Sequence, residues 1–281
     1  LCNPHNPVGR VWSKEELRSV ARICAENDVV VIADEIHADL ALQPHRFVPF
    51  AEAAKGTGVT WAATHGPIKT FGLAGVCDTL LITDNDDVAG RFKEMSNRLH
   101  LTRNNVFGIA AFEIAYREGG DWLDGLLDLI RSNIERLAGG LPEGIEVMPH
   151  QATYLAWLDF RALGLDVPEL ARWLAESGLA LSPGHWFGRE GAGFARMSIA
   201  SASVDIDGLT ELASDASVKM LILCNPHNPV GRVWSREELR SVARICAATE
   251  VVVIADEIHA DLALQPHRFV PFAEAAKGTG V

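Results

Sequence analysis

The chain has 281 residues, of which 48% are hydrophobic and 22% charged, so it can bury a substantial core and is too apolar for a disordered tail. Its 25 basic and 37 acidic residues give a net charge of −12, which argues against nucleic acid and favours a small-molecule partner. No apolar run is long enough to cross a bilayer and no signal-peptide pattern is visible, so we expect a cytoplasmic protein with no membrane partner.

The first third of the chain predicts alternating helices and strands. Ser13 and Glu16 form a capping-box pattern ahead of a helix whose apolar residues recur at helical spacing. The run 29–33 is apolar throughout, which predicts a strand of a parallel sheet that is covered on both faces. In the rest of this region we expect a short helix near 49–55 and strands over 59–64 and 76–83.

The middle of the chain predicts long helices followed by a mixed region. One helix is expected from Asp86 to about Arg117, and a second from Asp121 to the glycine pair at 139–140. Residues 145–215 predict the order β-α-β-β-α. Its expected elements are strands over 153–160, 179–182 and 193–200, and helices over 168–177 and from Asp205 onward.

Residues 1–59 recur at 223–281 with a constant offset, and 55 of the 59 positions are identical. Solenoid repeats diverge and come in series, so we interpret this single duplication as a recent rearrangement or an assembly error. A strand expected over 218–223 precedes the second copy. Only one copy can occupy the place beside the strand that leads to Lys69, and we favour the first because it continues directly into that strand.

Three motifs in order carry the chemistry. The turn Asn3-Pro4-His5-Asn6-Pro7-Val8-Gly9 comes first, and Asp34-Glu35-Ile36-His37 follows the apolar strand, at the edge where open α/β sheets bind ligands. Lys69 then lies in the segment Ile68-Lys69-Thr70-Phe71-Gly72-Leu73-Ala74-Gly75. Together these motifs resemble the class I/II aminotransferase superfamily of pyridoxal 5'-phosphate (PLP) enzymes. Their amino-acid sequences are most similar to those of its cystathionine β-lyase type C–S lyases.

The resemblance implies an α/β fold of the type I PLP-dependent class. We expect a partial large domain with a parallel-rich sheet covered by helices over 1–118, a linking helix and smaller C-terminal α/β domain over 119–216, and the second copy over 217–281. The chain begins at Leu1 within an expected strand-to-loop junction, and the family's N-terminal half of the large domain is not in it, so we expect a truncated N-terminus.

Within this resemblance, each candidate residue takes a role in binding PLP. Lys69 would hold the cofactor aldehyde and move the proton at the substrate Cα, and Asp34 would pair with the pyridine nitrogen. His37 and Asn6 would contact the ring oxygen, while Thr64 is the nearest hydroxyl for the lysine segment. Gly66 and Ile68 stand where the family usually has hydroxyl residues, and Cys77 stands where it often has a phosphate-binding arginine.

Arg196 is the candidate for the substrate carboxylate, because a guanidinium fork meets a carboxylate in two parallel hydrogen bonds, and Tyr154 could line the same site. Each residue also has a structural interpretation, such as a buried core histidine for His37. The second copy offers Asn228, Asp256 and His259 as alternatives. We expect no metal, since the acidic residues and His37 fit no compact ligand set.

The function implied is that of an enzyme with a small amino-acid substrate, which cleaves a sulfur amino acid to thiol, pyruvate and ammonia. An aminotransferase and a catalytically inactive homologue that acts as an interaction module are the alternatives. Members of the family are dimers, so the resemblance also implies a homodimer.

Overall fold

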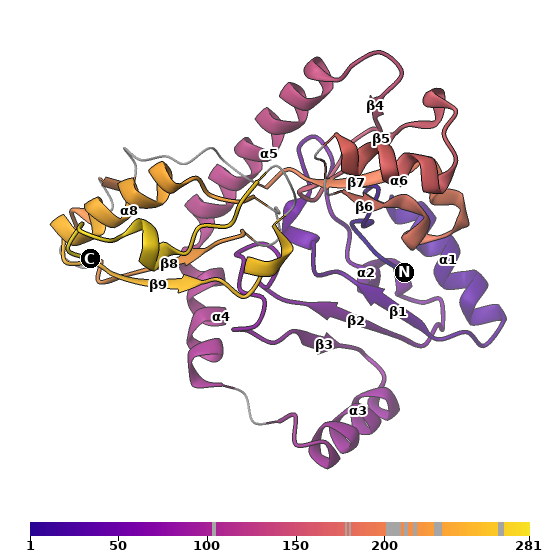
Figure 1. Cartoon of the computed structure of the whole chain (residues 1–281). Coiled ribbons are helices and arrows are strands. Elements are labelled where there is room, and N and C mark those ends of the chain that lie inside the picture. The colour runs from indigo at the N-terminus through magenta and orange to yellow at the C-terminus, as the bar shows by residue number, and fades with distance from the viewer. Residues whose placement is uncertain are drawn as a thin grey trace. The chain divides into compact units, whose positions relative to one another are not determined.

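The computed structural model describes residues 1–281 apart from 103–104, 178, 180, 201–208, 211–212, 216–217, 228–231 and 264–266. The chain forms two compact units (Figure 1). Unit 1 comprises Leu1–Gly164 and Gly184–Ile199, and unit 2 comprises Leu165–Pro183 and Ala200–Val281. The domain boundaries expected after residues 118 and 216 stay predictions.

The main sheet of unit 1 has the strand order β1-β2-β3 (Figure 1). β1 (Val31–Asp34) and β2 (Trp61–His65) run parallel, and β3 (Leu80–Ile82) pairs antiparallel with β2. The strands predicted over 29–33 and 59–64 are therefore confirmed, and only the last part of the strand predicted over 76–83 forms. Its first part is a turn instead, because the N–H groups of Val76 and Cys77 both donate to the carbonyl of Leu73.

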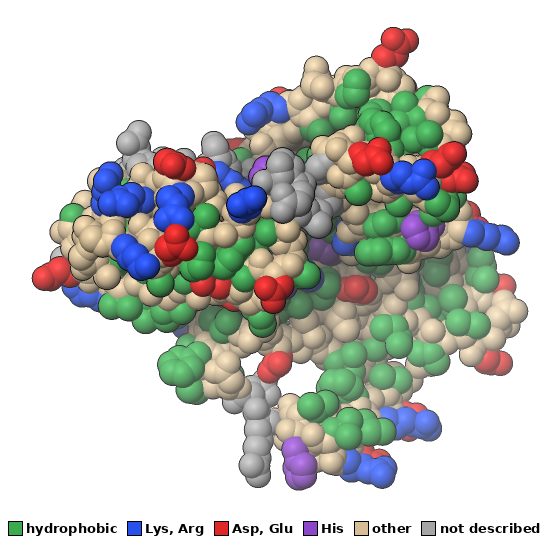
Figure 2. All heavy atoms as spheres, viewed as in Figure 1, with side chains coloured by type: hydrophobic (Ala, Val, Ile, Leu, Met, Phe, Trp, Pro, Cys, Tyr) green, Lys and Arg blue, Asp and Glu red, His purple; other side chains and the backbone are tan. Residues whose placement is uncertain are grey.

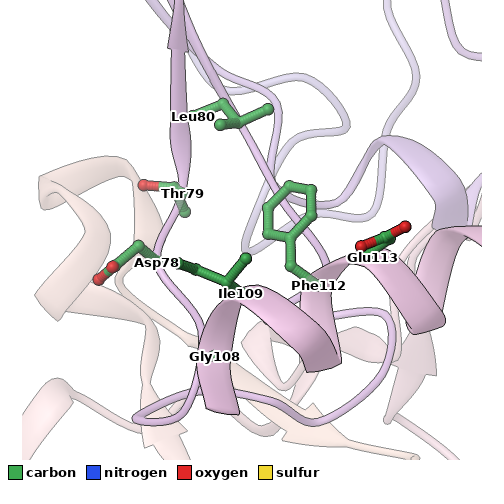
Figure 3. Close-up of a pocket in the computed structure, with 7 residues that line it drawn as sticks. All are labelled: Asp78, Thr79, Leu80, Gly108, Ile109, Phe112 and Glu113. Carbon is green, nitrogen blue, oxygen red and sulfur yellow. The ribbon is translucent and has the colours of Figure 1, made fainter. Parts of the chain in front are cut away.

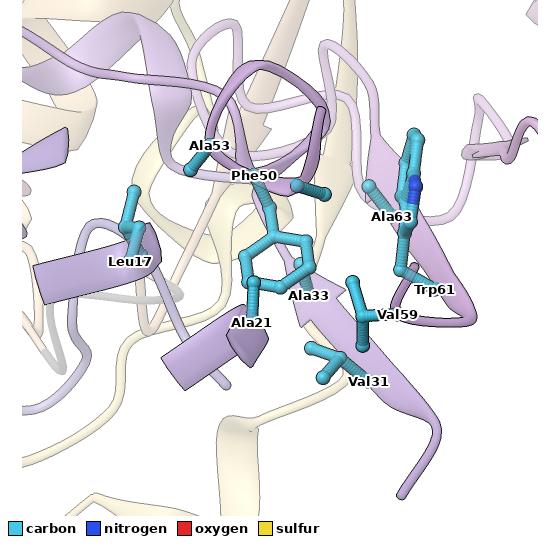
Figure 4. Packing of buried hydrophobic residues seen from close by; sticks show 10 residues of the cluster. Leu17, Ala21, Val31, Ala33, Phe50, Ala53, Val59, Trp61 and Ala63 are labelled. Carbon is cyan, nitrogen blue, oxygen red and sulfur yellow. The ribbon is translucent and has the colours of Figure 1, made fainter. Parts of the chain in front are cut away.

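Two helices and a 3₁₀ helix accompany this sheet. α1 (Lys14–Glu26) begins with the predicted capping box of Ser13 and Glu16, and α2 (Phe50–Ala54) and η1 (Ala38–Leu40) follow β1. Figure 4 shows the core that they form with the sheet, in which the Phe50 ring lies between α1 and the strands. The buried members are Leu17, Ala21, Val31, Ala33, Phe50, Ala53, Ala54, Val59, Trp61 and Ala63.

The expectation that β1 is buried on both faces is wrong. Val31 and Ala33 are 5% and 0% exposed, but Val30 and Ile32 are 55% and 63% exposed. Side chains alternate across a strand, and α1 and α2 pack only against the face that carries Val31 and Ala33. The apolar run therefore has one core-facing and one exposed side.

The single helix predicted from Asp86 to Arg117 is also wrong, since the structure has α3 (Asp86–Arg98) and α4 (Val106–Glu118). His100 adopts a φ of 57°, a left-handed conformation that a right-handed helix cannot continue through. Asn105 then caps α4 by accepting the N–H groups of Phe107 and Gly108. The next predicted helix is confirmed as α5 (Gly120–Gly140).

A second, antiparallel sheet in unit 1 contains β4 (Glu146–Val147), β5 (Leu155–Asp159) and β7 (Phe194–Ser198). The 3₁₀ helices η2 (Arg161–Leu163), η3 (Gly184–Phe187) and η4 (Arg189–Gly191) lie in the connections. The strands predicted over 153–160 and 193–200 are confirmed. Trp157 lies opposite Arg196 in the β5–β7 register and stacks on Phe194, so Trp157 is a core residue.

Unit 2 begins with α6 (Val167–Glu176), which confirms the helix predicted over 168–177. The strand predicted over 179–182 is shorter and later, as β6 (Ser182–Pro183), and residue 180 is not described. The first residues of the helix predicted from Asp205 lie outside the described part of the chain.

The second copy in unit 2 repeats the local structure of the first. β8 (Met220–Cys224) confirms the strand predicted before it and runs parallel to β9 (Val252–Asp256), the counterpart of β1. α8 (Arg236–Ala248), η5 (Ala260–Leu262) and α9 (Phe272–Ala275) correspond to α1, η1 and α2. Their core includes Leu239, Val242, Cys246, Val251 and Phe272.

Basic and acidic side chains are interspersed on the face drawn in Figure 2. None of the helices in the described ranges combines the length and the apolar character that crossing a membrane requires.

Candidate active site

The candidate site begins where β1 ends. Asp34 is the last residue of β1 and lies opposite Thr64 of β2 in the parallel register. The Thr64 hydroxyl donates to Asp34 Oδ1 at 3.4 Å, and the Ile36 N–H donates to the same oxygen at 3.3 Å. The adjacent strands therefore hold the carboxylate at the C-terminal edge of the parallel pair, where α/β sheets bind ligands.

His37 is a buried polar side chain at this edge. It is 2% exposed, and the described residues provide no hydrogen-bond partner for its Nδ1. Its ring meets that of Tyr154 edge to face, with 5.7 Å between centroids. An orphaned ring nitrogen in so buried a position is uncommon in a purely structural histidine, because leaving a buried polar atom unpaired costs about 1–3 kcal/mol.

Three predicted site residues act on the charge of this imidazole. Burial is the largest cause that lowers the pKa of His37, which is about 4, and the positive charge of Lys69 is the second. Asp34 opposes this shift and Arg196 adds to it. His37 is therefore neutral at pH 7, and the structure brings Lys69, Asp34 and Arg196 into one electrostatic neighbourhood around it.

Arg196 and Asn6 meet although 190 positions separate them. Arg196 Nη1 donates to Asn6 Oδ1 at 2.9 Å, and the guanidinium lies over the Phe187 ring, 4.7 Å from its centroid. Burial lowers the pKa of Arg196, while Tyr154 acts in the opposite direction. Asn6 itself comes from the Asn-Pro turn, which Asn3 fixes by bonding to the Val48 carbonyl at 2.9 Å.

Lys69 lies in the turn after β2 and is half-buried. The next residue, Thr70, donates from its hydroxyl to Asp39 Oδ2 at 2.9 Å. Tyr116 of α4 lies between Asp39 and His65, with its hydroxyl 3.5 Å from Asp39 Oδ2 and 3.1 Å from His65 Nε2. This cluster ties the turn of Lys69 to η1 and α4.

Sequence reasoning missed this supporting cluster and also the buried acid Glu35. Glu35 is 4% exposed and accepts the Phe50 N–H at 2.6 Å, so it joins β1 to α2. Burial raises the pKa of Glu35 to about 7, and the Phe50 bond opposes that shift. No spacing in the sequence marks Asp39, His65 or Tyr116 as neighbours, because three separate elements supply them.

Cys77 offers no charge to an anion. Its thiol is buried and bonds to the Gly108 carbonyl at 3.2 Å. A separate pocket of about 260 Å³ lies between the start of β3 and α4 and shares no residue with the His37 neighbourhood. Figure 3 shows its lining, with Phe112 and Ile109 of α4 on one side and Leu80 on the other.

The second-copy alternatives lie in unit 2, where β9 has β8 as its neighbour. Asp256 ends β9 and is exposed, and His259 is half-buried, unlike its counterpart His37. Asn228 lies outside the described residues. The strand that pairs with β2, which leads to Lys69, is thus β1 of the first copy.

Comparisons with known proteins show which family this chain resembles. The family described as "Aminotransferase class I and II" matches residues 1–205 and 190–280. The chain is 36% identical to cystathionine beta-lyase PatB of Bacillus subtilis over 77% of its length and 57% of that protein. It is 34% identical to protein MalY of Escherichia coli, over 70% of this chain and 51% of that protein.

Solved structures agree with these relatives. A PLP-bound putative aminotransferase from Clostridium difficile 630 superposes with a TM-score of 0.68 at 36% identity, over 71% of this chain and 53% of that one. Cystalysin from Treponema denticola, which contains a PLP cofactor, gives 0.65 at 32% identity, over 71% and 52%. The chain spans about half the length of the curated relatives that it matches. The predicted type I PLP-dependent α/β fold and the predicted family are confirmed: this chain belongs to the class I and II aminotransferase family.

Proposed function

We propose that this chain binds PLP and acts as a carbon–sulfur β-lyase on a sulfur amino acid such as cystathionine. The observation that carries the proposal is the neighbourhood of His37, where an amine, a carboxylate, a guanidinium and an unpaired ring nitrogen gather in unit 1. The similarity to cystathionine beta-lyases supports C–S cleavage among the reactions of the family.

The residues present suit the ring end of the cofactor. Asp34 offers a carboxylate at the sheet edge for the pyridine nitrogen, and His37 offers a neutral ring nitrogen that has no described partner. Lys69 is half-buried on a turn that Thr70 and Asp39 hold in place. The fit concerns the pyridine ring and the aldehyde that Lys69 would hold. It does not extend to the phosphate, since Cys77 stands where a phosphate-binding arginine is common and its thiol is already bonded to the Gly108 carbonyl.

When bound, PLP supplies an electron sink for the pair released at the substrate Cα. Lys69 would hold the cofactor aldehyde, and its Nζ would take the Cα proton. Asp34 would keep a proton on the pyridine nitrogen, and neutral His37, together with Asn6, would contact the ring oxygen. Cleavage of the Cβ–S bond would leave its electron pair on sulfur, and with one water the products would be a thiol, pyruvate and ammonia.

Arg196 binds the substrate carboxylate. A planar guanidinium makes two parallel hydrogen bonds to a carboxylate, and the Asn6 amide already orients one edge of it. Tyr154 packs against His37 and lies near enough to raise the pKa of Arg196, so it would line the same substrate site. Thr64 supports Asp34 through its hydroxyl, which donates to Asp34 Oδ1.

Attachment of PLP to a named lysine tests the proposal. The protein is mixed with PLP, reduced with borohydride and digested, and mass spectrometry locates the modified lysine. We expect modification at Lys69 and its loss in Lys69→Ala. Modification elsewhere, or none, would contradict the assignment and would favour an inactive homologue.

Matched variants of the two copies test which acid is used. Asp34→Ala should abolish the thiol and pyruvate formed from cystathionine, whereas Asp256→Ala should leave them near the wild-type level. Equal losses in both variants would contradict the choice of the first copy. Formation of a new amino acid only when an oxo acid is added would indicate an aminotransferase instead.

A further inference from the structure

The turn that carries Lys69 is fixed by the residue that follows it. Thr70 is 1% exposed, and its hydroxyl donates to Asp39 Oδ2 at 2.9 Å. The turn itself closes through the N–H of Phe71, which donates to the Pro67 carbonyl at 2.9 Å. A hydrogen bond to a charged group contributes about 1.5–3 kcal/mol, so the Thr70 bond restrains the backbone next to Lys69.

The other end of this bond leads to His37. Asp39 lies in η1, whose N-cap is His37, and the N–H of Leu40 donates to the His37 carbonyl at 3.0 Å. A short path therefore joins the imidazole to the amine, first along η1 from His37 to Asp39 and then from Thr70 to Lys69. The hydrogen bond between Thr70 and Asp39 is the link in this path, and it spans 31 positions of the sequence.

Helices α4 and α5 support the same link. The Tyr116 hydroxyl of α4 lies 3.5 Å from Asp39 Oδ2. Burial raises the pKa of Tyr116, and Asp39 adds to the rise, so the hydroxyl keeps its proton for that bond. The Tyr116 ring also meets the Phe71 ring edge to face at 6.0 Å. From α5, Trp122 Nε1 donates to the Thr70 carbonyl at 3.5 Å. Thus η1, α4 and α5 all hold this turn.

We propose that Thr70 is a positioning residue, and that its bond to Asp39 sets the distance from the Lys69 amine to the His37 ring. Tyr116 assists through Asp39. This inference deepens the proposed function and rests on it for the roles of Lys69 and His37. Thr70 acts through Lys69 and not by contact with the substrate.

The pKa of His37 reports this distance without any cofactor. Burial is the largest cause that lowers it to about 4, and the positive charge of Lys69 is the second. The other charged groups that act on the ring are Asp34, which opposes the shift, and Arg196, which adds to it. The Tyr154 ring packs against the imidazole. Because the effect of a charge weakens with distance, movement of the Lys69 amine away from His37 raises the pKa of His37.

Replacing Thr70 by valine tests the proposal, because valine is nearly the same size and lacks the hydroxyl. NMR titration of the ring proton of His37, assigned by its loss in His37→Gln, measures the pKa in each variant. We expect an upward shift in Thr70→Val that is smaller than the shift in Lys69→Met. Thr70→Ser retains the donor and should match the wild type. Thr70→Ala gives the same comparison if the valine variant does not fold. An unchanged pKa of His37 without the hydroxyl would overturn the proposal.

The double variant Lys69→Met/Thr70→Val separates positioning from a general loosening of the fold. Once the amine is absent, loss of the Thr70 hydroxyl should leave the pKa of His37 as it is in Lys69→Met, because the charge that it positions is gone. An equal rise with and without Lys69 would show that Thr70 only keeps His37 buried, and would refute the positioning role. The titrations need no PLP, so their outcome is independent of whether the proposed function holds.

Catalysis gives a second measurement. Thr70→Val should lower kcat for thiol release from cystathionine by up to roughly 100-fold, the loss that a displacement of about 1 Å can cause, and should change KM little. Asp39→Ala should behave in the same way, whereas Asp261→Ala, the matched variant in the second copy, should resemble the wild type. A Thr70→Val enzyme with wild-type kcat would contradict the inference. A wild type that releases no thiol would instead refute the proposed function, and the titrations would still decide the role of Thr70.

Discussion

Replacing Glu35 by glutamine tests whether burial controls the pH dependence of the stability of unit 1. Glu35 is 4% exposed, and its pKa is about 7 instead of the usual 4.5, chiefly because of burial. Between these two pH values the unfolded chain has lost the proton while the folded chain keeps it. The folded state thus binds more protons, so its stability decreases as pH rises through this window.

The size of the effect follows from the shift. Each pKa unit corresponds to about 1.4 kcal/mol, so the carboxylate costs the folded state on the order of 3 kcal/mol once pH exceeds about 7. Glutamine is neutral throughout and its Oε1 can still accept the Phe50 N–H that Glu35 accepts at 2.6 Å. Glu35→Gln should therefore lack this loss of stability.

Urea unfolding of the wild type and of Glu35→Gln at several pH values measures the difference in the free energy of unfolding. As pH rises between the two pKa values, the free energy of unfolding of Glu35→Gln should increase relative to that of the wild type by about 1.4 kcal/mol per pH unit. A difference that is constant with pH would refute the argument. The matched control is Glu257→Gln, because Glu257 makes the same 2.6 Å bond to Phe272 but is half-buried. An equal pH-dependent difference there would refute burial as the cause.

Three further predictions concern unit 1. His37→Gln should show the opposite sign: the pKa of His37 is about 4 instead of 6.5, so wild-type stability rises with pH between these values, and the variant should lack this rise in urea unfolding. Leu17→Ala should cost about 2–5 kcal/mol in thermal or urea unfolding, since Leu17 is 0% exposed, and a loss under about 1 kcal/mol would contradict the packing. Arg196→Lys should raise the KM for the amino-acid substrate roughly 10- to 100-fold with a smaller change in kcat, because lysine cannot make the paired hydrogen bonds, and an unchanged KM would remove Arg196 from the carboxylate site.

Local patterns predicted much of this molecule. The capping box of Ser13 and Glu16, the strand before Asp34 and the long helix α5 depend on neighbouring residues, and each lies where the sequence indicated. The repeat could also be identified from the sequence alone, because it appears as identical residues at a constant offset. The break after α3 was missed, because the left-handed conformation of His100 is not marked by glycine or proline.

The amino-acid sequence by itself determined the family and the residue types available for PLP chemistry, since ordered motifs around Asn6, Asp34 and Lys69 survive in the chain. Only the tertiary structure decided which of them share a neighbourhood, for example the bond between Arg196 and Asn6 across 190 positions. It also decided which copy of the repeat lies beside β2, and that β1 is covered on one face. The physical reason is that burial, and with it the pKa values of His37 and Glu35, depends on packing between elements that are distant along the chain.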